Sequence, residues 1–329
     1  MSARRSRRRW WLVGLSVLLV LLAVAYFRSR PHPPPAHVRG NRGENGLWLR
    51  YTWYFGQHSP HDLANLAIRL RRAQVRYAYF HVRFITAKGR LRFRNPQQAR
   101  QLVHALHKQA PGTRLLAWVY VGIGGQYHQV HLHDASVRKV MVQEAVWLVK
   151  TCGFDGVQWD AEICNNGNAD LLALLRETRA ALPAGTILGV CGCPWYPAPA
   201  TGIYGWDDAY IGQVAAASDQ IAVMAYDSGA ATPWAYVGFV QQQTVHFTQD
   251  AAQCNPHCRI LIGVPTYGAA GNPLVHNPLA ETLSNALHGV RAGLPGANST
   301  TFAGVAPFAD NTTTAAHWKA YQTLWVRRH

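Results

Sequence analysis

Apolar runs suited to buried strands alternate along this chain with segments whose apolar residues recur at helical spacing. The strand-like runs are 47–55, 76–85, 114–121, 154–162, 186–193, 219–226, 259–265 and 301–307. The helical runs lie near 60–73, 96–109, 136–151, 168–181, 207–217, 233–251, 279–291 and 315–327. Eight such pairs in succession predict an α/β chain that closes into a (β/α)8 TIM barrel, with its chemistry at the carboxyl ends of the strands.

The beginning of the chain departs from this alternation. An arginine cluster at 4–9 precedes an apolar run at 10–27, whose 18 residues are at the short end of a membrane span. The cluster would keep the first residues in the cytoplasm and place the barrel outside. We therefore expect a cytoplasmic Arg-rich segment with a membrane anchor or signal peptide at 1–30, a Pro-rich linker at 31–45, and the barrel domain at 46–329.

Two interpretations of the apolar run remain open. An uncleaved helix would anchor the protein in the membrane, with the barrel outside the cytoplasm. The small residues Ala23, Val24 and Ala25 also form a plausible cleavage site, which would make the run a removable signal peptide and the protein secreted or periplasmic. Either interpretation predicts that the barrel is exported.

Composition narrows the choice of partners. Hydrophobic residues make up 49% of the chain, enough for a large core. The formal charge of +16 falls to +9 without the seven arginines of the first 30 positions. The remaining charge could favour anionic surfaces such as lipid or acidic cell-wall polymer. The basic residues are scattered over predicted helices and no nucleic-acid-binding motif is present, so we expect no nucleic acid partner. We also expect the protein to be a monomer.

The six cysteines agree with an oxidising compartment. Cys254 and Cys258 flank a short turn and could close a small loop. Cys164 and Cys193 fall at the ends of neighbouring predicted strands and could also pair. The partners of the other two cysteines, Cys152 and Cys191, cannot be read from the sequence.

The strongest chemical signal is the run Gly153–Glu162, a predicted buried strand. Side chains alternate along a strand, so Gln158, Asp160 and Glu162 share one face, and the two carboxylates lie about 6–7 Å apart. Carboxylates this close raise each other's pKa, which lets one keep its proton near neutral pH. The alternative is an edge strand with a solvated polar face, but unpaired buried charge is costly without a task.

Three motifs in order carry a family resemblance. The Asp155-Gly156 pair with Asp160 and Glu162 resembles the Asp-Gly-x-Asp-x-Asp-x-Glu signature of family 18 glycoside hydrolases, which are chitinase-type TIM barrels. Ile221–Asp227 resembles the sixth strand of that family, with its Met-x-Tyr-Asp ending. Ile260–Gly268 resembles the seventh, with its Gly-x-Pro-x-Tyr-Gly ending.

The resemblance implies a role for each matching position. Glu162 would protonate the glycosidic oxygen, and Asp160 would orient the substrate's N-acetyl group and stabilise the charge that develops on it. Tyr226 would donate a hydrogen bond to the acetamido carbonyl, and Asp227 would help to hold the sugar. Asp155 would support the strand and its local hydrogen bonds.

Gln158 departs from the signature, which has an acid at this position. A neutral amide removes one like charge, so we expect Asp160 to ionise more easily and Glu162 to hold its proton less tightly. The amide can still donate a hydrogen bond to Asp160. Retained activity with a lower pH optimum is the expected outcome.

Aromatic residues at the predicted strand ends suit a carbohydrate cleft, because their rings stack on the apolar faces of sugars. We expect no cofactor and no metal, because the loose spacing of His128, His131 and His133 fits a surface loop better than a metal site. The candidate substrate-binding residues are therefore Trp53, Trp118, Trp195, Tyr267, Asp155, Gln158 and Asp227.

Three functions remain open from the sequence. The first is a hydrolase of N-acetylhexosamine-containing glycans such as chitin, a bacterial amino-polysaccharide or peptidoglycan. The second is a chitinase-like carbohydrate-binding protein without turnover, against which the intact Glu162 argues. The third is a barrel glycosidase that acts on a sugar without an acetamido group.

Overall fold

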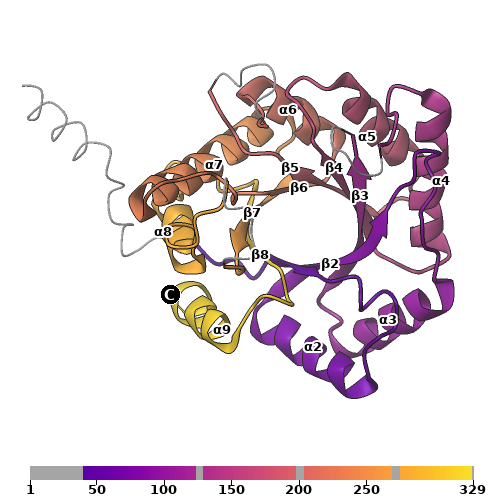
Figure 1. The fold of residues 1–329 in the computed structure, drawn as a ribbon, viewed down its shortest axis with the longest axis horizontal. Coiled ribbons are helices and arrows are strands. Elements are labelled where there is room, and N and C mark those ends of the chain that lie inside the picture. Colours follow the sequence, from indigo (N-terminus) through magenta and orange to yellow (C-terminus); the bar gives the residue numbers. More distant parts are fainter. Residues whose placement is uncertain (1–39, 124–128, 198–203, 269–274, 328–329) are drawn as a thin grey trace, which may run out of the picture.

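The computed structural model describes residues 40–123, 129–197, 204–268 and 275–327. Eight parallel strands follow one another around a single sheet in sequence order, and helices surround it (Figure 1). The predicted (β/α)8 barrel is therefore confirmed. The strands are β1 (Asn45–Leu49), β2 (Val75–Phe84), β3 (Arg114–Gly122), β4 (Gly156–Glu162), β5 (Ile187–Gly192), β6 (Gln220–Val223), β7 (Arg259–Pro265) and β8 (Phe302–Phe308).

The helices lie close to the predicted ranges. They are α2 (Pro60–Arg72), α3 (Pro96–Gln109), α4 (Ala135–Lys150), α5 (Ala169–Ala181), α6 (Asp208–Ala217), α7 (Pro233–Cys254), α8 (Leu283–Gly293) and α9 (Ala315–Tyr321), which continues into the π-helix η1 (Gln322–Val326). Helix α2 shows why the pattern works. Ser59 and Asp62 form a capping box at its start, and Leu66 and Leu70 face the barrel.

The first strand is shorter than predicted. β1 ends at Leu49, and residues 51–56 form a turn in which the Phe55 amide donates to the Tyr51 carbonyl at 3.1 Å. The aromatic residues of this segment have high strand propensity, but they pack as side chains of a turn instead. Trp53 is therefore a turn residue, not a strand residue.

Asn45 joins the first strand to the last. Its Oδ1 atom accepts hydrogen bonds from the Val305 amide at 3.2 Å and the Trp325 indole at 2.8 Å, and its Nδ2 atom donates to the Gln74 carbonyl at 3.2 Å. Gly304 leaves room for this side chain, because a Cβ atom there would lie 2.6 Å from Asn45 Oδ1. The side chain thus bridges β1, β8 and the C-terminal helix.

The start of the domain lies slightly earlier than expected. Gly40 is already buried, and a Cβ atom there would lie within 2.9 Å of Leu294 and Trp325. Across the described part of the chain, no helix has both the length and the apolar character needed to cross a membrane. The predicted anchor at 10–27 lies outside the described residues.

The predicted disulfides are absent, because all six cysteines are free thiols. The Cys193 thiol donates to the Cys164 carbonyl at 3.5 Å, and the Cys164 thiol lies 3.8 Å from the Tyr210 hydroxyl. Cys254 is exposed whereas Cys258 is buried. Cys164 and Cys193 are therefore neighbours without a disulfide, whereas Cys254 and Cys258 differ in exposure.

Replacing Asn45 with Ala should destabilise the barrel. The change leaves the Val305 amide and the Trp325 indole without their acceptor, at a cost of about 1–3 kcal/mol for each buried donor. Urea denaturation should show this as a lower free energy of unfolding. The control is Asn65→Ala, at an exposed position of α2. Equal stability of the two variants would contradict the bridging role of Asn45.

Candidate active site

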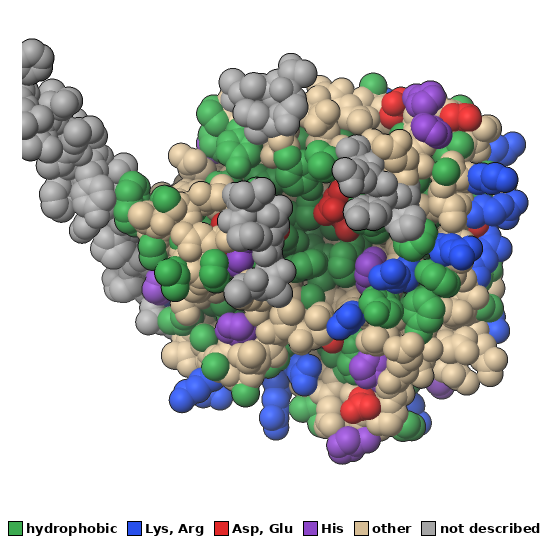
Figure 2. Space-filling model, viewed as in Figure 1, with side chains coloured by type: hydrophobic (Ala, Val, Ile, Leu, Met, Phe, Trp, Pro, Cys, Tyr) green, Lys and Arg blue, Asp and Glu red, His purple; other side chains and the backbone are tan. Residues whose placement is uncertain are grey.

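Strand β4 carries three polar residues, Gln158, Asp160 and Glu162, at alternate positions. It pairs with β3 on one side, where Tyr120 lies opposite Asp160, and with β5 on the other, where Gly189 lies opposite Gln158. Gln158 and Asp160 are buried, and Glu162 at the carboxyl end is partly exposed. Figure 2 shows acidic side chains in a hollow of this face, surrounded by hydrophobic ones. β4 is thus an interior strand, and the alternative of a solvated edge strand is excluded.

Asp160 is held by a tryptophan of the neighbouring strand. The Trp118 indole donates to Asp160 Oδ2 at 2.8 Å, and the ring stacks on His81 with centroids 4.1 Å apart. Burial lowers the pKa of His81 to about 3, so this ring is neutral near pH 7. Burial raises the pKa of Asp160 to about 6, although hydrogen bonding to Trp118 and then Cys191 opposes the shift.

Glu162 holds its proton more tightly than Asp160. Its pKa is raised well above the usual range, first by burial and then by the negative charges of Asp160 and Asp227. A protonated Glu162 and an ionised Asp160 can therefore exist together near neutral pH. This is the division of roles that a general acid with a charged neighbour requires.

The sequence-based expectation for Gln158 is corrected in part. Its Oε1 atom accepts a hydrogen bond from the Trp48 indole at 2.9 Å, but its Nε2 atom has no partner among the described residues. The amide therefore does not donate to Asp160. Burial raises the pKa of both carboxyl groups, and easier ionisation of Asp160 than with an acid at position 158 stays a prediction.

The ends of β6 and β7 bring two tyrosines to the same place. Tyr226 is 8% exposed, and burial raises its pKa well above the usual value, so its hydroxyl remains a donor. The Tyr267 hydroxyl donates to Asp227 Oδ1 at 2.6 Å, and the two tyrosine rings meet edge to face with centroids 5.9 Å apart. Asp227 adopts a φ of 53° as the chain turns after Tyr226.

Phe308 is a site residue that the sequence did not reveal. It stacks on Tyr226 with centroids 5.0 Å apart, and the rings of Trp118 and Tyr267 lie 5.9 and 6.0 Å from its own. It forms an apolar surface between the predicted residues. The available signal was its position directly after the run 301–307, where the eighth strand was expected to end.

A buried network behind Asp227 was also missed. The Asp227 amide donates to Glu281 at 2.7 Å, and His276 Nδ1 lies 3.0 Å from Asp227 Oδ1. The side chains of His276 and Glu281 are 1% and 0% exposed. His276 lies just before the predicted helical run 279–291 and Glu281 near its start, but neither position belongs to a motif that indicated a role at the site.

Asp155 and Trp195 lie away from this group. Asp155 precedes β4 at the end opposite Glu162, where its carboxylate accepts from the Leu115 amide at 2.7 Å. This place fits the supporting role and not substrate binding. The Trp195 ring stacks on His246 of α7 with centroids 3.5 Å apart, so its face is directed to the helices outside the barrel.

Trp53 lies near the mouth of the barrel, but its indole N–H and one face of its ring are already engaged by other side chains. Its indole donates to Asp310 Oδ2 at 2.8 Å, and its face stacks on His58 with centroids 3.6 Å apart. The Gly-rich turn after β3 and His128 fall largely outside the described residues, whereas His131 and His133 are exposed.

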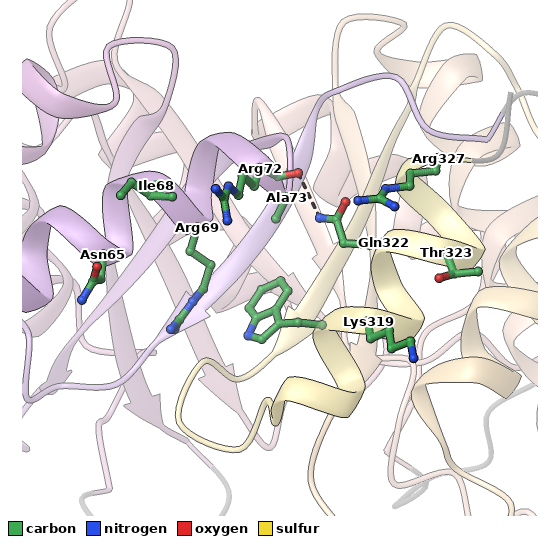
Figure 3. Close-up of a pocket in the computed structure, with 10 residues that line it drawn as sticks. Asn65, Ile68, Arg69, Arg72, Ala73, Lys319, Gln322, Thr323 and Arg327 are labelled. Carbon is green, nitrogen blue, oxygen red and sulfur yellow. Dashed lines mark hydrogen bonds between the residues drawn. The ribbon is translucent and has the colours of Figure 1, made fainter.

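A separate groove of about 940 Å³ opens on the outer wall between α2 and the C-terminal helices (Figure 3). Its basic lining includes Arg69, Arg72, Lys319 and Arg327, and no carboxylate contributes to it. The groove therefore lacks the acid that glycosidic bond cleavage needs. The strand ends of the barrel are therefore the candidate active site.

A (β/α)8 barrel with two carboxyl groups at its strand ends matches the arrangement of a TIM-barrel glycoside hydrolase. The model of the Glycosyl hydrolases family 18 matches residues 50–325, and the chain belongs to this family. No sequence among the curated proteins matches the chain.

Solved structures share the fold at low sequence identity. The Bacillus cereus spore cortex-lytic enzyme SleL has a TM-score of 0.60 at 13% identity, covering 88% of this chain and 75% of its own. A class V chitinase from Pseudomonas fluorescens Pf-5 has a TM-score of 0.57 at 17% identity, covering 85% and 99%. A class V chitinase mutant from Cycas revoluta, in complex with (GlcNAc)3, has a TM-score of 0.56 at 14% identity, covering 86% and 99%.

Replacing Glu162 with Gln should stabilise the protein at neutral pH. The raised pKa means that the folded state binds this proton more tightly than the unfolded chain. Parent stability therefore falls as pH rises above the unfolded value of about 4.3, and the amide variant escapes this loss. We expect the variant to be more stable than the parent at pH 8 and the difference to disappear toward pH 4.

Thermal unfolding between pH 4 and pH 8 measures this difference. The matched control is Glu177→Gln on α5, which removes a partly exposed carboxylate paired with Arg138 at 2.9 Å. That variant should gain no stability as pH rises. A Glu162→Gln variant that tracks the parent at every pH would show that Glu162 is not held protonated.

Proposed function

We propose that this protein hydrolyses N-acetylhexosamine-containing glycans by substrate-assisted, retaining catalysis. The observation that carries the proposal is the pair on β4, in which Glu162 holds its proton more tightly than Asp160 two residues earlier. Tyr226 adds a hydroxyl donor in the same barrel interior. Family membership supports this scheme, because family 18 enzymes use the substrate's acetamido oxygen as nucleophile.

In the proposed first step, Glu162 donates its proton to the glycosidic oxygen as the bond to C1 breaks. The acetamido oxygen of the same sugar attacks C1 and forms a cyclic oxazolinium intermediate. Asp160, ionised above about pH 6, faces the acetamido N–H and stabilises the positive charge that develops there. The Tyr226 hydroxyl donates to the acetamido oxygen and orients it.

In the second step, the Glu162 carboxylate accepts a proton from water, which attacks C1 and reopens the ring. The configuration at C1 is retained and Glu162 regains its proton. Phe308 and Tyr226 would form the apolar floor under the sugar, since their rings stack with centroids 5.0 Å apart. Asp227, held by Tyr267 and His276, would hold the sugar from the side.

The choice of glycan is the finer part of the proposal. Chitin oligomers are supported by similarity to a chitinase that carries (GlcNAc)3, and peptidoglycan by similarity to a spore cortex-lytic enzyme. Both polymers supply the acetamido group that the mechanism needs. We further propose that the barrel works outside the cytoplasm, because an arginine cluster at 4–9 precedes an apolar run at 10–27.

A screen of chitin and peptidoglycan oligosaccharides tests the function. The parent protein should release reducing ends from at least one, and Glu162→Gln should lower kcat by about 10²–10⁴-fold, as expected for loss of a general acid. Glu177→Gln should keep parental activity. A thiazoline mimic of the cyclised intermediate should inhibit competitively. Turnover that resists this mimic would exclude the substrate-assisted scheme, and equal activity of the two Gln variants would exclude Glu162 as the acid.

The pH profile of kcat/KM should have an acid limb near pH 6, because activity requires ionised Asp160. Its basic limb should lie higher, where Glu162 loses its proton. Trp118→Phe removes a donor that favours the Asp160 anion, so the acid limb should move to higher pH. Trp53→Phe removes an indole that donates to Asp310 and should leave the limb in place. Equal shifts in both variants would contradict the link between Trp118 and Asp160.

A further inference from the structure

Three side chains on the outer wall of the barrel converge from two helices. Asp208 is the first residue of α6, and His246 and Asp250 lie one turn apart on α7, so they share one face of that helix. α6 and α7 pack side by side (Figure 1). One ligand atom from each of the three residues lies within 4.8 Å of the others. We propose that they bind a divalent metal ion of the Zn²⁺ type.

The spacing suits an ion of this size. His246 Nδ1 lies 3.0 Å from Asp208 Oδ1. Ligand bonds of about 2.0–2.2 Å place neighbouring ligand atoms roughly 3–3.6 Å apart around the metal. The His–Asp pair is already close to this separation, and the Asp250 ligand atom lies within 4.8 Å of both. One imidazole and two carboxylates leave a position for water.

Asp250 distinguishes this cluster from an ordinary surface His–Asp pair. The residue is 8% exposed, and its Oδ2 atom has no hydrogen-bond partner in the described part of the chain. Neither Asp250 nor Asp208 forms an ion pair with Lys or Arg among those residues. A buried carboxylate oxygen without a partner is costly. A bound cation would satisfy it and offset the repulsion between the two carboxylates.

Trp195 supplies the supporting contacts that metal ligands need. Its ring stacks on His246 at an interplanar angle of 10°, and its indole N–H donates to Asp208 Oδ1. The Gln243 side chain on α7 accepts from the Trp195 amide and donates to its carbonyl. The tryptophan thus fixes the orientation of two ligands, a role in which outer contacts typically govern affinity.

The site is separate from the catalytic centre. Asp160 and Glu162 point into the barrel from β4, whereas the three proposed ligands lie on the helices that cover its outside. A bound ion would join the start of α6 to the second half of α7. We therefore assign it a structural role, as a clamp between two helices of the wall.

Calorimetric titration of the untagged, chelator-treated full chain with Zn²⁺ tests the proposal, and Co²⁺ absorption reports the ligand geometry. The parent should bind one ion with a rise in the thermal midpoint. Asp250→Asn should weaken Zn²⁺ affinity by at least roughly tenfold, because loss of a residue that only supports a metal ligand already costs about that much. His246→Ala should weaken Zn²⁺ affinity by a similar factor. Because His246 is partly exposed, this variant keeps the test available if Asp250→Asn, at a buried position, fails to fold.

Two further variants make the result specific. Trp195→Phe keeps the stacking ring but loses the indole donor, so it should weaken affinity while the stoichiometry stays at one. His133→Ala changes an exposed histidine beside His131 and should leave binding unchanged. Absence of binding at millimolar Zn²⁺ would overturn the proposal. Parental affinity in Asp250→Asn and His246→Ala would do so equally, as would loss of binding only in His133→Ala.

Discussion

The candidate active site depends on keeping the buried carboxylate of Asp160 charged. Strand β4 directs Asp160 inward, and burial opposes its ionisation. The Trp118 indole counteracts this, and its position is fixed by stacking on the neutral ring of His81. The charge that survives on Asp160 then helps Glu162 to keep its proton. The contact between His81 on β2 and Trp118 on β3 therefore influences the pKa of the carboxyl groups on β4.

The neutral amide of Gln158 leaves fewer charged groups on β4 than the family signature, which has an acid at this position. Trp48 donates to its oxygen, so a buried indole is satisfied without another negative charge in the barrel. The proton on Glu162 is then held by burial and by only two neighbouring charges, those of Asp160 and Asp227. Asp227 in turn keeps its place because its amide donates to Glu281 before α8 and its carboxylate accepts from the Tyr267 hydroxyl after β7. Electrostatic control of Glu162 is thereby shared between β4 and the turn that follows β6.

The sequence predicted those features that follow from a regular pattern of residues or from a motif. Strand and helix ranges followed from periodicity, and the grouping of Asp160, Glu162 and Tyr226 followed from motifs on strands whose carboxyl ends meet. It failed where direction depends on packing. Trp195 follows a strand like the other aromatics, yet its ring turns toward the helices. No local pattern could assign His276, because its contact with Asp227 joins positions far apart in the chain.

The chain enters the barrel through Gly40 and Asn45, at the amino end of the first strand. The acidic residues of β4 lie at the opposite end, because all eight strands are parallel. The described chain therefore starts at the end of the barrel that lies opposite Glu162, so its first contacts and the acidic residues occupy the two different ends of the strands.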